Sequence, residues 1–384
     1  MRVLAGKPIY LSQSPSISPP HHQSLTTSIS IPGDSMIFSM KDTFFKRIAL
    51  PFMVVISSAA ATVSLSGCSA LLDEEPQPCP VGLEIRFVYD YNLERANAFP
   101  AQVDCLTLHI YDSEGRYVAT RTETTDVLAD EDYRMTVDLP EGEYRLLAYG
   151  GMECDRASFS HTSLPAEGSL DTEAGVILNP ECLEPGSPKG HLHDHFYGSL
   201  KTEVRMSPER KAVTVKMMKN TNHFRMVLQH LSYEPIDGRD YDFRIVDDNT
   251  LFDHTNNLVD NGTVTYTPWA TGSISTGTAE TPDGRAINEV KIGYADMSTS
   301  RLMTRRSPRL IVTHKATNTE IINIPLNNYL LAFRSDHFSW CGEQEFLDRK
   351  SDWQLFFFLS DPLTWYKAYI KVDDWIVRVN EIVE

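Results

Sequence analysis

Residues 81–91 read VGLEIRFVYDY, and this stretch decides the fold class. Every second position from Val81 to Tyr91 is apolar or aromatic, while Glu84, Arg86 and Asp90 stand between them. Successive side chains of a β-strand point to opposite faces of its sheet, so this spacing predicts a strand with one buried face.

The same alternation recurs through the following 60 or so residues, separated by turn sequences. Leu106 to Ile110 runs into Asp112-Ser113-Glu114-Gly115, which predicts a hairpin with a second strand from Arg116. Met135 to Leu139 is followed by Pro140-Glu141-Gly142 and a further strand from Tyr144 to Tyr149. Proline lacks the donor that a β-ladder needs and glycine permits turn geometry, so the chain is expected to reverse there. The pattern predicts an all-β domain.

The rest of the chain indicates a second unit of the same class. Residues 155–190 are rich in Ser, Pro, Gly and Glu and predict a long connection, with one short strand at 176–178. Beyond Met206-Ser207-Pro208-Glu209, short apolar runs separated by turn signals resume. Residues 340–350 are a helix candidate. We therefore expect two tandem β-sandwich domains, at residues 80–207 and 208–384.

An export signal precedes these domains. A basic segment, Lys41 to Arg47, is followed by an apolar run of 16 residues from Ile48 to Val63. That is shorter than the roughly 20 residues of a spanning helix and is typical of a signal peptide. Leu65-Ser66-Gly67-Cys68 then looks like a bacterial lipobox, in which Cys68 receives a diacylglyceryl thioether, is released by cleavage and is acylated on its new amine.

Residues 1–67 are therefore expected to be a doubtful extension plus a lipoprotein signal peptide, and residues 68–79 a lipidated acidic leader. Residues 1–35 carry almost no charge and precede a complete signal, so we exclude them from the fold. The alternative is an ordinary signal cleaved after Ala59-Ala60-Ala61, which leaves Cys68 as a plain thiol. Several acyl chains on one cysteine anchor a protein stably, because each buried methylene contributes about 0.8 kcal/mol.

The charge of the chain excludes one class of partner. The whole sequence has a formal charge of −17, and residues 1–67 hold five basic and two acidic residues, so the mature chain is near −20. Nucleic-acid binding depends on neutralising phosphates, which this acidic chain without a Lys/Arg block does not favour. Electrostatic binding to anionic lipid is disfavoured for the same reason.

The cysteines indicate disulfide chemistry. With Cys68 lipidated, five cysteines remain in an oxidising compartment: Cys79, Cys105, Cys154, Cys182 and Cys341. Because five is odd, at least one stays free or pairs with another chain. We expect a disulfide between Cys154 and Cys182, which flank the loop-rich end of one domain. Cys105 lies in a strand pattern and is expected either in a disulfide or as a buried thiol.

Signals for catalysis are lacking. The sequence contains no nucleophile elbow, HExxH, phosphate loop or dinucleotide fingerprint. His191, His193 and His195 would share one face on a strand, but they follow a Pro/Gly-rich linker where such residues are usually solvated. We therefore expect no enzyme activity, no catalytic residues, no cofactor, no small-molecule substrate and no metal site.

Several motifs, in their order, resemble a known family, the lipoprotein fimbrial anchoring subunits of Bacteroidales. They follow the lipobox along nearly all of the mature chain: Cys79-Pro80 with Gly82, the hairpin of 106–118, Leu139 to Tyr144, Ala148 to Gly151, Phe196-Tyr197-Gly198, Arg301-Leu302-Met303 and Trp375 to Asn380.

The resemblance implies a pair of transthyretin-like, Greek-key β-sandwiches and a structural role at the cell surface. Such subunits attach a fimbrial shaft to the outer membrane through acyl chains, palmitate among them, and end its growth. Shaft subunits of this class join by donor-strand exchange, a form of β-strand addition. We expect the strands from Ala368 to Val379 to serve the next subunit, or simply to close the second domain.

Two other functions remain open on the sequence. A surface glycan-binding lipoprotein of a nutrient-uptake system would share the anchor and the β-rich body. A lipidated shaft or tip pilin of the same assembly class would be cleaved after a basic residue, such as Arg86 or Arg95.

Overall fold

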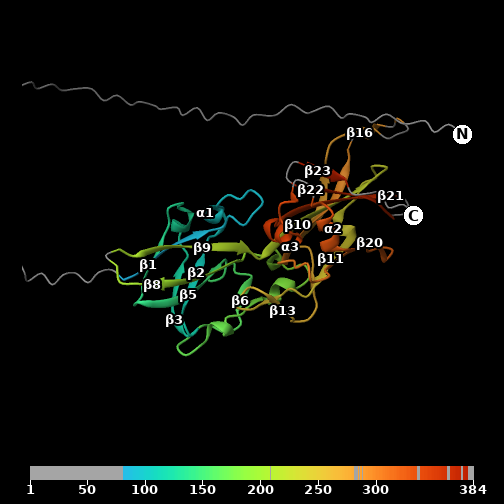
Figure 1. Ribbon diagram of the computed structural model, residues 1–384. Coiled ribbons are helices and arrows are strands. Elements are labelled where there is room, and N and C mark those ends of the chain that lie inside the picture. The colour runs from blue at the N-terminus through green and yellow to red at the C-terminus, as the bar shows by residue number, and fades with distance from the viewer. Residues whose placement is uncertain are drawn as a thin grey trace, which may run out of the picture. The chain divides into compact units, whose positions relative to one another are not determined.

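The computed structural model describes residues 81–378, apart from 208, 281–283, 285, 288, 335–337, 361–363 and 373–374. The all-β prediction is confirmed, since β-strands account for most of the regular structure (Figure 1). The predicted signal peptide, lipobox and acidic leader lie outside the described residues.

The first sandwich is built on the stretch that decides the fold class. β1 (Gly82–Val88) buries Leu83, Ile85 and Phe87 and exposes Glu84, as the alternation predicts. Burying one such side chain contributes about 1.5–3 kcal/mol. β1 belongs to a seven-stranded sheet of order β3-β2-β5-β8-β9-β1-β4. The other strands are β2 (Leu106–Asp112), β3 (Tyr117–Glu123), β4 (Met135–Asp138), β5 (Gly142–Gly150), β8 (Phe196–Val204) and β9 (Lys211–Lys219).

This sheet folds over on itself. β8 and β9 pair only where Phe196 to Gly198 face Met217 to Lys219. Strands β4, β1 and β9 thus lie on one side of that short junction, and β3, β2, β5 and β8 on the other. Side chains from both sides share one core, whose members include Leu83, Val137, Val215, Leu108 and Leu146. A core between two such layers is the defining feature of a β-sandwich.

The first sheet extends beyond residue 207, where we expected the first domain to end. β9 runs parallel to β1, with Leu83 opposite Lys211 and Val88 opposite Lys216. The chain passes to the next sheet at Asn220, between β9 and β10. The division into domains at this point remains a prediction.

The second half contains a six-stranded sheet of order β15-β18-β10-β21-β22-β23 and a four-stranded sheet of order β14-β11-β19-β20. The two share a core that includes Met226, Leu355, Phe243 and Val312. The six-stranded sheet contains β10 (Thr221–His230), β15 (Ala270–Ser275), β18 (Lys291–Ser300), β21 (Asp352–Ser360), β22 (Thr364–Val372) and β23 (Trp375–Arg378). The four-stranded sheet contains β11 (Tyr241–Asp247), β14 (Val264–Tyr266), β19 (Arg309–His314) and β20 (Thr319–Pro325).

Smaller elements complete the described chain. The predicted long connection forms two short strands, β6 and β7, which pair with each other. β7 also pairs with β12 of the second half, in a sheet of order β13-β12-β7-β6. The strands of this sheet are β6 (Phe159–His161), β7 (Val176–Leu178), β12 (Leu251–Phe252) and β13 (Leu258–Val259), and a separate pair is β16 (Ala279–Glu280) with β17 (Ala286–Ile287). The helices are α1 (Phe99–Gln102), α2 (Leu326–Leu331) and α3 (Glu343–Arg349), of which α3 fulfils the helix prediction for 340–350.

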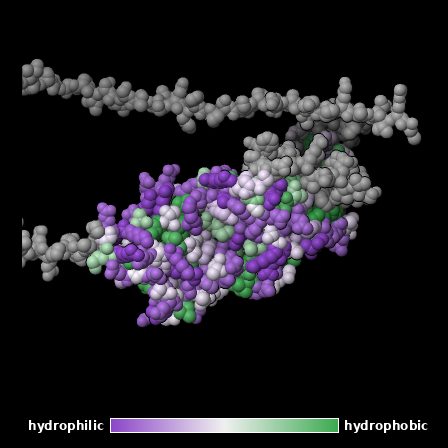
Figure 2. Space-filling view, viewed as in Figure 1, coloured by the Kyte–Doolittle hydropathy of each residue, from purple (hydrophilic) through white to green (hydrophobic). Residues whose placement is uncertain are grey.

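The described surface is mostly hydrophilic. Figure 2 shows hydrophilic residues over most of the visible face, with hydrophobic residues scattered in small groups. Among the described helices, none combines the length and the apolar character needed to cross a bilayer.

Candidate functional site

The disulfide prediction is wrong. Cys154 is bonded to Cys105, with their Cα atoms 6.0 Å apart, and Cys182 is a buried free thiol 3.8 Å from the carbonyl oxygen of Ser158. The cause is the register of β2 against β5, which places Leu106 opposite Gly150. Cys105 directly precedes β2 and Cys154 follows β5, so this antiparallel pairing brings the two cysteines together. Cys68 and Cys79 lie outside the described residues.

The three histidines of residues 191–195 do not share one face, because this segment is not a strand. His191 stacks on Trp269 with ring centroids 4.3 Å apart. His193 Nε2 lies 2.9 Å from Asp104 Oδ1. His195 is fully buried and stacks on Phe159. Each imidazole therefore has its own environment.

Asp194, between these histidines, is the centre of a polar cluster. Its carboxylate lies 2.8 Å from the ammonium of the buried Lys219 and 2.8 Å from His223 Nε2, and accepts a hydrogen bond from Thr221 Oγ1. Burial by itself would raise the pKa of Asp194, but the hydrogen bond from His223 and the charge of Lys219 outweigh burial and hold this pKa below its usual range. The cluster links the segment before β8, which carries Asp194, to the end of β9 and the start of β10.

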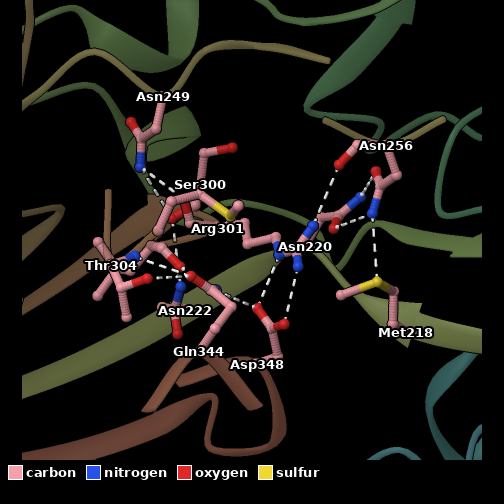
Figure 3. A network of polar contacts seen from close by, with 12 residues as sticks. Met218, Asn220, Asn222, Asn249, Asn256, Ser300, Arg301, Thr304, Gln344 and Asp348 are labelled. Atoms are coloured by element: carbon pink, nitrogen blue, oxygen red, sulfur yellow. Dashed lines mark hydrogen bonds and ion pairs between the residues drawn. The ribbon is translucent and has the colours of Figure 1, made fainter. Parts of the chain in front are cut away.

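A second polar network lies around Asn220, where the chain passes from β9 of the seven-stranded sheet to β10 of the six-stranded sheet (Figure 3). Asn220 and Asn256 exchange two amide hydrogen bonds of 2.7 and 3.0 Å, and Arg301 donates to the carbonyl of Asn256. Arg301 also pairs with Asp348 of α3, which in turn accepts from Gln344. Buried polar groups that are fully hydrogen-bonded specify one arrangement of the elements that carry them. This gives the motif Arg301-Leu302-Met303 a structural role.

Three histidines form a third cluster beside β2, of which His109 and His195 are buried and His161 is half-buried. His109 Nε2 and His161 Nε2 lie 3.0 Å apart, and Tyr149 packs edge-on against His161. Burial lowers the pKa of His109 to about 3, of His161 to about 4 and of His195 to about 3. Charging two imidazoles in contact within an apolar core is unfavourable, which explains these directions. All three are neutral at pH 7. Local alternation did not reveal this cluster, because its members come from three separate segments.

The last described strand lies at the end of a sheet. β23 is hydrogen-bonded to β22, with Tyr369 opposite Arg378 and Val372 opposite Trp375, and stands last in the order of the six-stranded sheet. Within the described residues its other edge has no strand beside it. An end strand presents backbone N–H and C=O groups that another strand can pair with.

The tryptophans do not form a shared platform among the described residues. Trp353 is buried, Trp269 stacks on His191, and the guanidinium of Arg95 lies 3.6 Å over the ring of Trp340. Side-chain positions of Trp365 and Trp375 lie outside the description.

Comparisons with known proteins agree with this architecture. The sequence model of the fimbrillin-A associated anchor proteins Mfa1 and Mfa2 matches residues 75–381. A candidate adhesin from Bacteroides thetaiotaomicron is 50% identical, with a TM-score of 0.72 over 79% of this chain and 99% of that chain. A candidate polysaccharide-binding protein from the same organism is 29% identical, with a TM-score of 0.64 over 78% of this chain and 98% of that chain.

The fimbrial anchor protein Mfa2 from Porphyromonas gingivalis has the same fold. It is 14% identical, with a TM-score of 0.56 over 78% of this chain and 99% of that chain. A search of curated proteins gave no match.

Proposed function

Because this chain belongs to the family of fimbrillin-A associated anchor proteins, we propose that it attaches a fimbrial shaft to the outer membrane and terminates its assembly. The family consists of fimbrial and adhesin structural proteins, not of enzymes. Family membership places the chain at the cell surface, among fimbrial subunits. The proposal adds the means of attachment at each end of the chain.

The membrane end of the proposal is Cys68. The basic segment, apolar run and lipobox stand in the order that lipoprotein export requires, so Cys68 is acylated. Its acyl chains then hold the base of the fibre in the membrane. Mass spectrometry of the membrane-extracted protein tests this point. A peptide that begins at Cys68 and carries acyl groups supports it, whereas an unmodified Cys68 within a longer peptide contradicts it.

The shaft end of the proposal is β23. The position of β23 at the end of the six-stranded sheet is the observation that carries this part, because β-strand addition needs an edge with unpaired backbone groups. Main-chain hydrogen bonds from a strand of the shaft subunit would extend the sheet beyond β23. The net negative charge of the chain disfavours association between its copies before that partner arrives.

Three truncations test the role of β23. A chain ending after Asp361 lacks β22 and β23, one ending after Asp374 lacks β23 alone, and one ending after Arg378 keeps both and serves as the matched control. We expect the first two to lose the shaft subunit from the material that co-purifies with the chain, while the control retains it. Retention after removal of β23 would show that this strand only closes its own sheet.

A lipidated shaft or tip subunit is the competing assignment within the same class. Arg95 is exposed in the turn after β1, where a protease can reach it, whereas Arg86 lies inside β1 between β4 and β9. Cleavage after Arg95 would remove β1 and uncover the core side chains that it buries. A chain in purified fimbriae that begins at Ala96 therefore supports the shaft assignment, and one that begins at Cys68 supports the anchor.

The glycan-binding function finds less support. It requires exposed aromatic rings that form a platform for sugars. Trp340 is 42% exposed, but the guanidinium of Arg95 lies over one face of its ring, and Trp353 is buried. The observation in its favour is the likeness to the candidate polysaccharide-binding protein. Specific retention of the chain on an immobilised polysaccharide would favour this function over the anchor.

A further inference from the structure

Four side chains with metal-binding atoms meet at the disulfide: its two cysteines, one aspartate and one histidine. Asp104 and Cys105 precede β2, Cys154 follows β5, and His193 precedes β8; one ligand atom from each lies within 4.8 Å of the others. We propose that reduction of the Cys105–Cys154 disulfide converts this cluster into a zinc site with two thiolate, one imidazole and one carboxylate ligand. This proposal is independent of the fimbrial role.

The spacing of the donor atoms suits a small tetrahedral ion. Bonds of roughly 2.0–2.3 Å from zinc to nitrogen, oxygen and sulfur place the ligand atoms of a tetrahedron about 3.3–3.8 Å apart. His193 Nε2 lies 3.5 Å from Cys154 Sγ, which already matches, and 2.9 Å from Asp104 Oδ1. Once the disulfide is broken, the sulfurs separate to the distance of two non-bonded ligands. Cys154 lies in a loop, which allows it to make this movement.

The groups around the cluster hold the ligands in place. The backbone N–H of His193 donates to Ser158 Oγ at 2.8 Å, which fixes the segment that carries the imidazole. The second carboxylate oxygen of Asp104 accepts from Arg156 Nη2 at 2.6 Å. Hydrogen bonds of this kind orient metal ligands and strengthen their binding. The positive charge of Arg156 also offsets the third negative ligand around a divalent ion.

Solvent and ions can reach the cluster from the side of Asp104 and His193, whereas Cys105 is buried. Asp104, Arg156 and His193 line a cavity of about 850 Å³, which is also lined by Cys182 and His191. Cys182 and His191 are not members of the group of four, so they provide controls within the same cavity.

The chemistry of the conversion balances with a dithiol as the reductant. The dithiol gives two electrons and forms its own disulfide, and its two protons pass to the sulfurs of Cys105 and Cys154. Zinc binding then displaces these two protons into solvent, because the thiolate is the form that binds the metal.

The test uses the full chain and Co²⁺ as a spectroscopic stand-in for Zn²⁺. The protein is treated anaerobically with a phosphine, which reduces the disulfide and takes oxygen from water, and is then titrated with Co²⁺. We expect the reduced chain to bind one Co²⁺ with a thiolate-to-cobalt charge-transfer band that Zn²⁺ abolishes, and the oxidised chain to show no such band.

Variants assign the signal to the cluster. His193→Ala should weaken Co²⁺ binding at least about tenfold, and Cys154→Ser should remove the two-thiolate spectrum. Cys182→Ser and His191→Ala should leave both unchanged. The proposal is overturned by a reduced chain without the charge-transfer band, or by equal binding in His193→Ala. A reduced chain that unfolds and does not refold with Zn²⁺ also overturns it.

Discussion

Arg301 and Asp348 form a bidentate ion pair, with Nε to Oδ1 and Nη2 to Oδ2 both at 2.7 Å and side chains only 12% and 4% exposed. The pair joins the chain after β18 to α3. It lies in the same network as Asn220, where the chain passes from the seven-stranded sheet to the six-stranded sheet (Figure 3). Buried polar pairs therefore surround this passage, beside an apolar cluster in which Tyr149 and Phe159 pack with Phe252.

Removing Arg301 should destabilise the protein strongly. Arg301→Ala leaves the carboxylate of Asp348 buried without its cation, and breaking such a pair costs about 3–5 kcal/mol of unfolding free energy. Urea unfolding monitored by tryptophan fluorescence measures this cost. Arg116→Ala is the control, because its partners Asp112 and Glu114 are on the surface, and little change is expected. Equal effects in the two variants would contradict this account of the network.

Gly151 should not tolerate a side chain. Its φ is +79°, and a Cβ there would lie 1.7 Å from the carbonyl oxygen of Asp194. Gly151→Ala must therefore displace the segment that carries Asp194, and we expect a loss of about 3 kcal/mol or more in unfolding free energy. Gly168 has a similar φ of +89° but no atom within 4 Å of a Cβ, so Gly168→Ala should cost only about 1 kcal/mol. Similar losses in both would show that the close approach is unimportant.

Stability should decrease as the pH falls below about 6.5. Burial lowers the pKa of His161 to about 4, whereas an unfolded histidine titrates near 6.5. Between these values the unfolded chain binds a proton that the folded chain does not, so acid favours unfolding. His109 and His195 act in the same direction.

The contribution of one histidine can be isolated. Each costs up to about 1.4 kcal/mol per pH unit in this window, so His161→Gln should lose about 2–3 kcal/mol less than the parent between pH 6.5 and 4.5. The comparison uses the slope of unfolding free energy against pH, which a uniform destabilisation by the substitution does not change. Identical slopes would contradict the neutral state of His161 in the folded chain.

Peptide mapping under non-reducing conditions should find Cys105 linked to Cys154. These cysteines are 49 residues apart, and closing a loop of that length in the unfolded chain corresponds to about 4 kcal/mol of stabilisation in the chain-entropy treatment. The double variant Cys105→Ser/Cys154→Ser should therefore unfold at lower urea, while Cys182→Ser should not. A link between Cys154 and Cys182 would restore the pairing expected from the sequence.

Local sequence patterns predicted the strands well and their partners poorly. The alternation at 81–91 and 106–110 corresponds to β1 and β2. β1 exposes Glu84 as that pattern predicts, whereas β2 is buried on both faces, with Thr107 and His109 on its polar side. The alternation contains no information on which strands pair. β9 consequently appeared to open the second domain, although it lies beside β1, more than 120 residues earlier in the chain.

The polar clusters were missed for a related reason. Asp104 and His193 are 89 residues apart, a separation too long for local sequence spacing to reveal. They meet only through the register of β2, β5 and β8. The disulfide prediction failed on the same point, since it weighed position in the chain and not strand pairing. The histidines at 191–195 were noticed as a group, but the irregular backbone there separates them.

The anchoring role of Cys68 can be measured as the partition of the fimbrial shaft between cells and medium. The amount of shaft subunit in each fraction is measured in cells that produce the parent chain or Cys68→Ser, with equal levels of the two chains. We expect Cys68→Ser to release the shaft into the medium, while the parent chain retains it on the cell. Shaft that stays on the cells with Cys68→Ser would contradict an anchoring role for this protein.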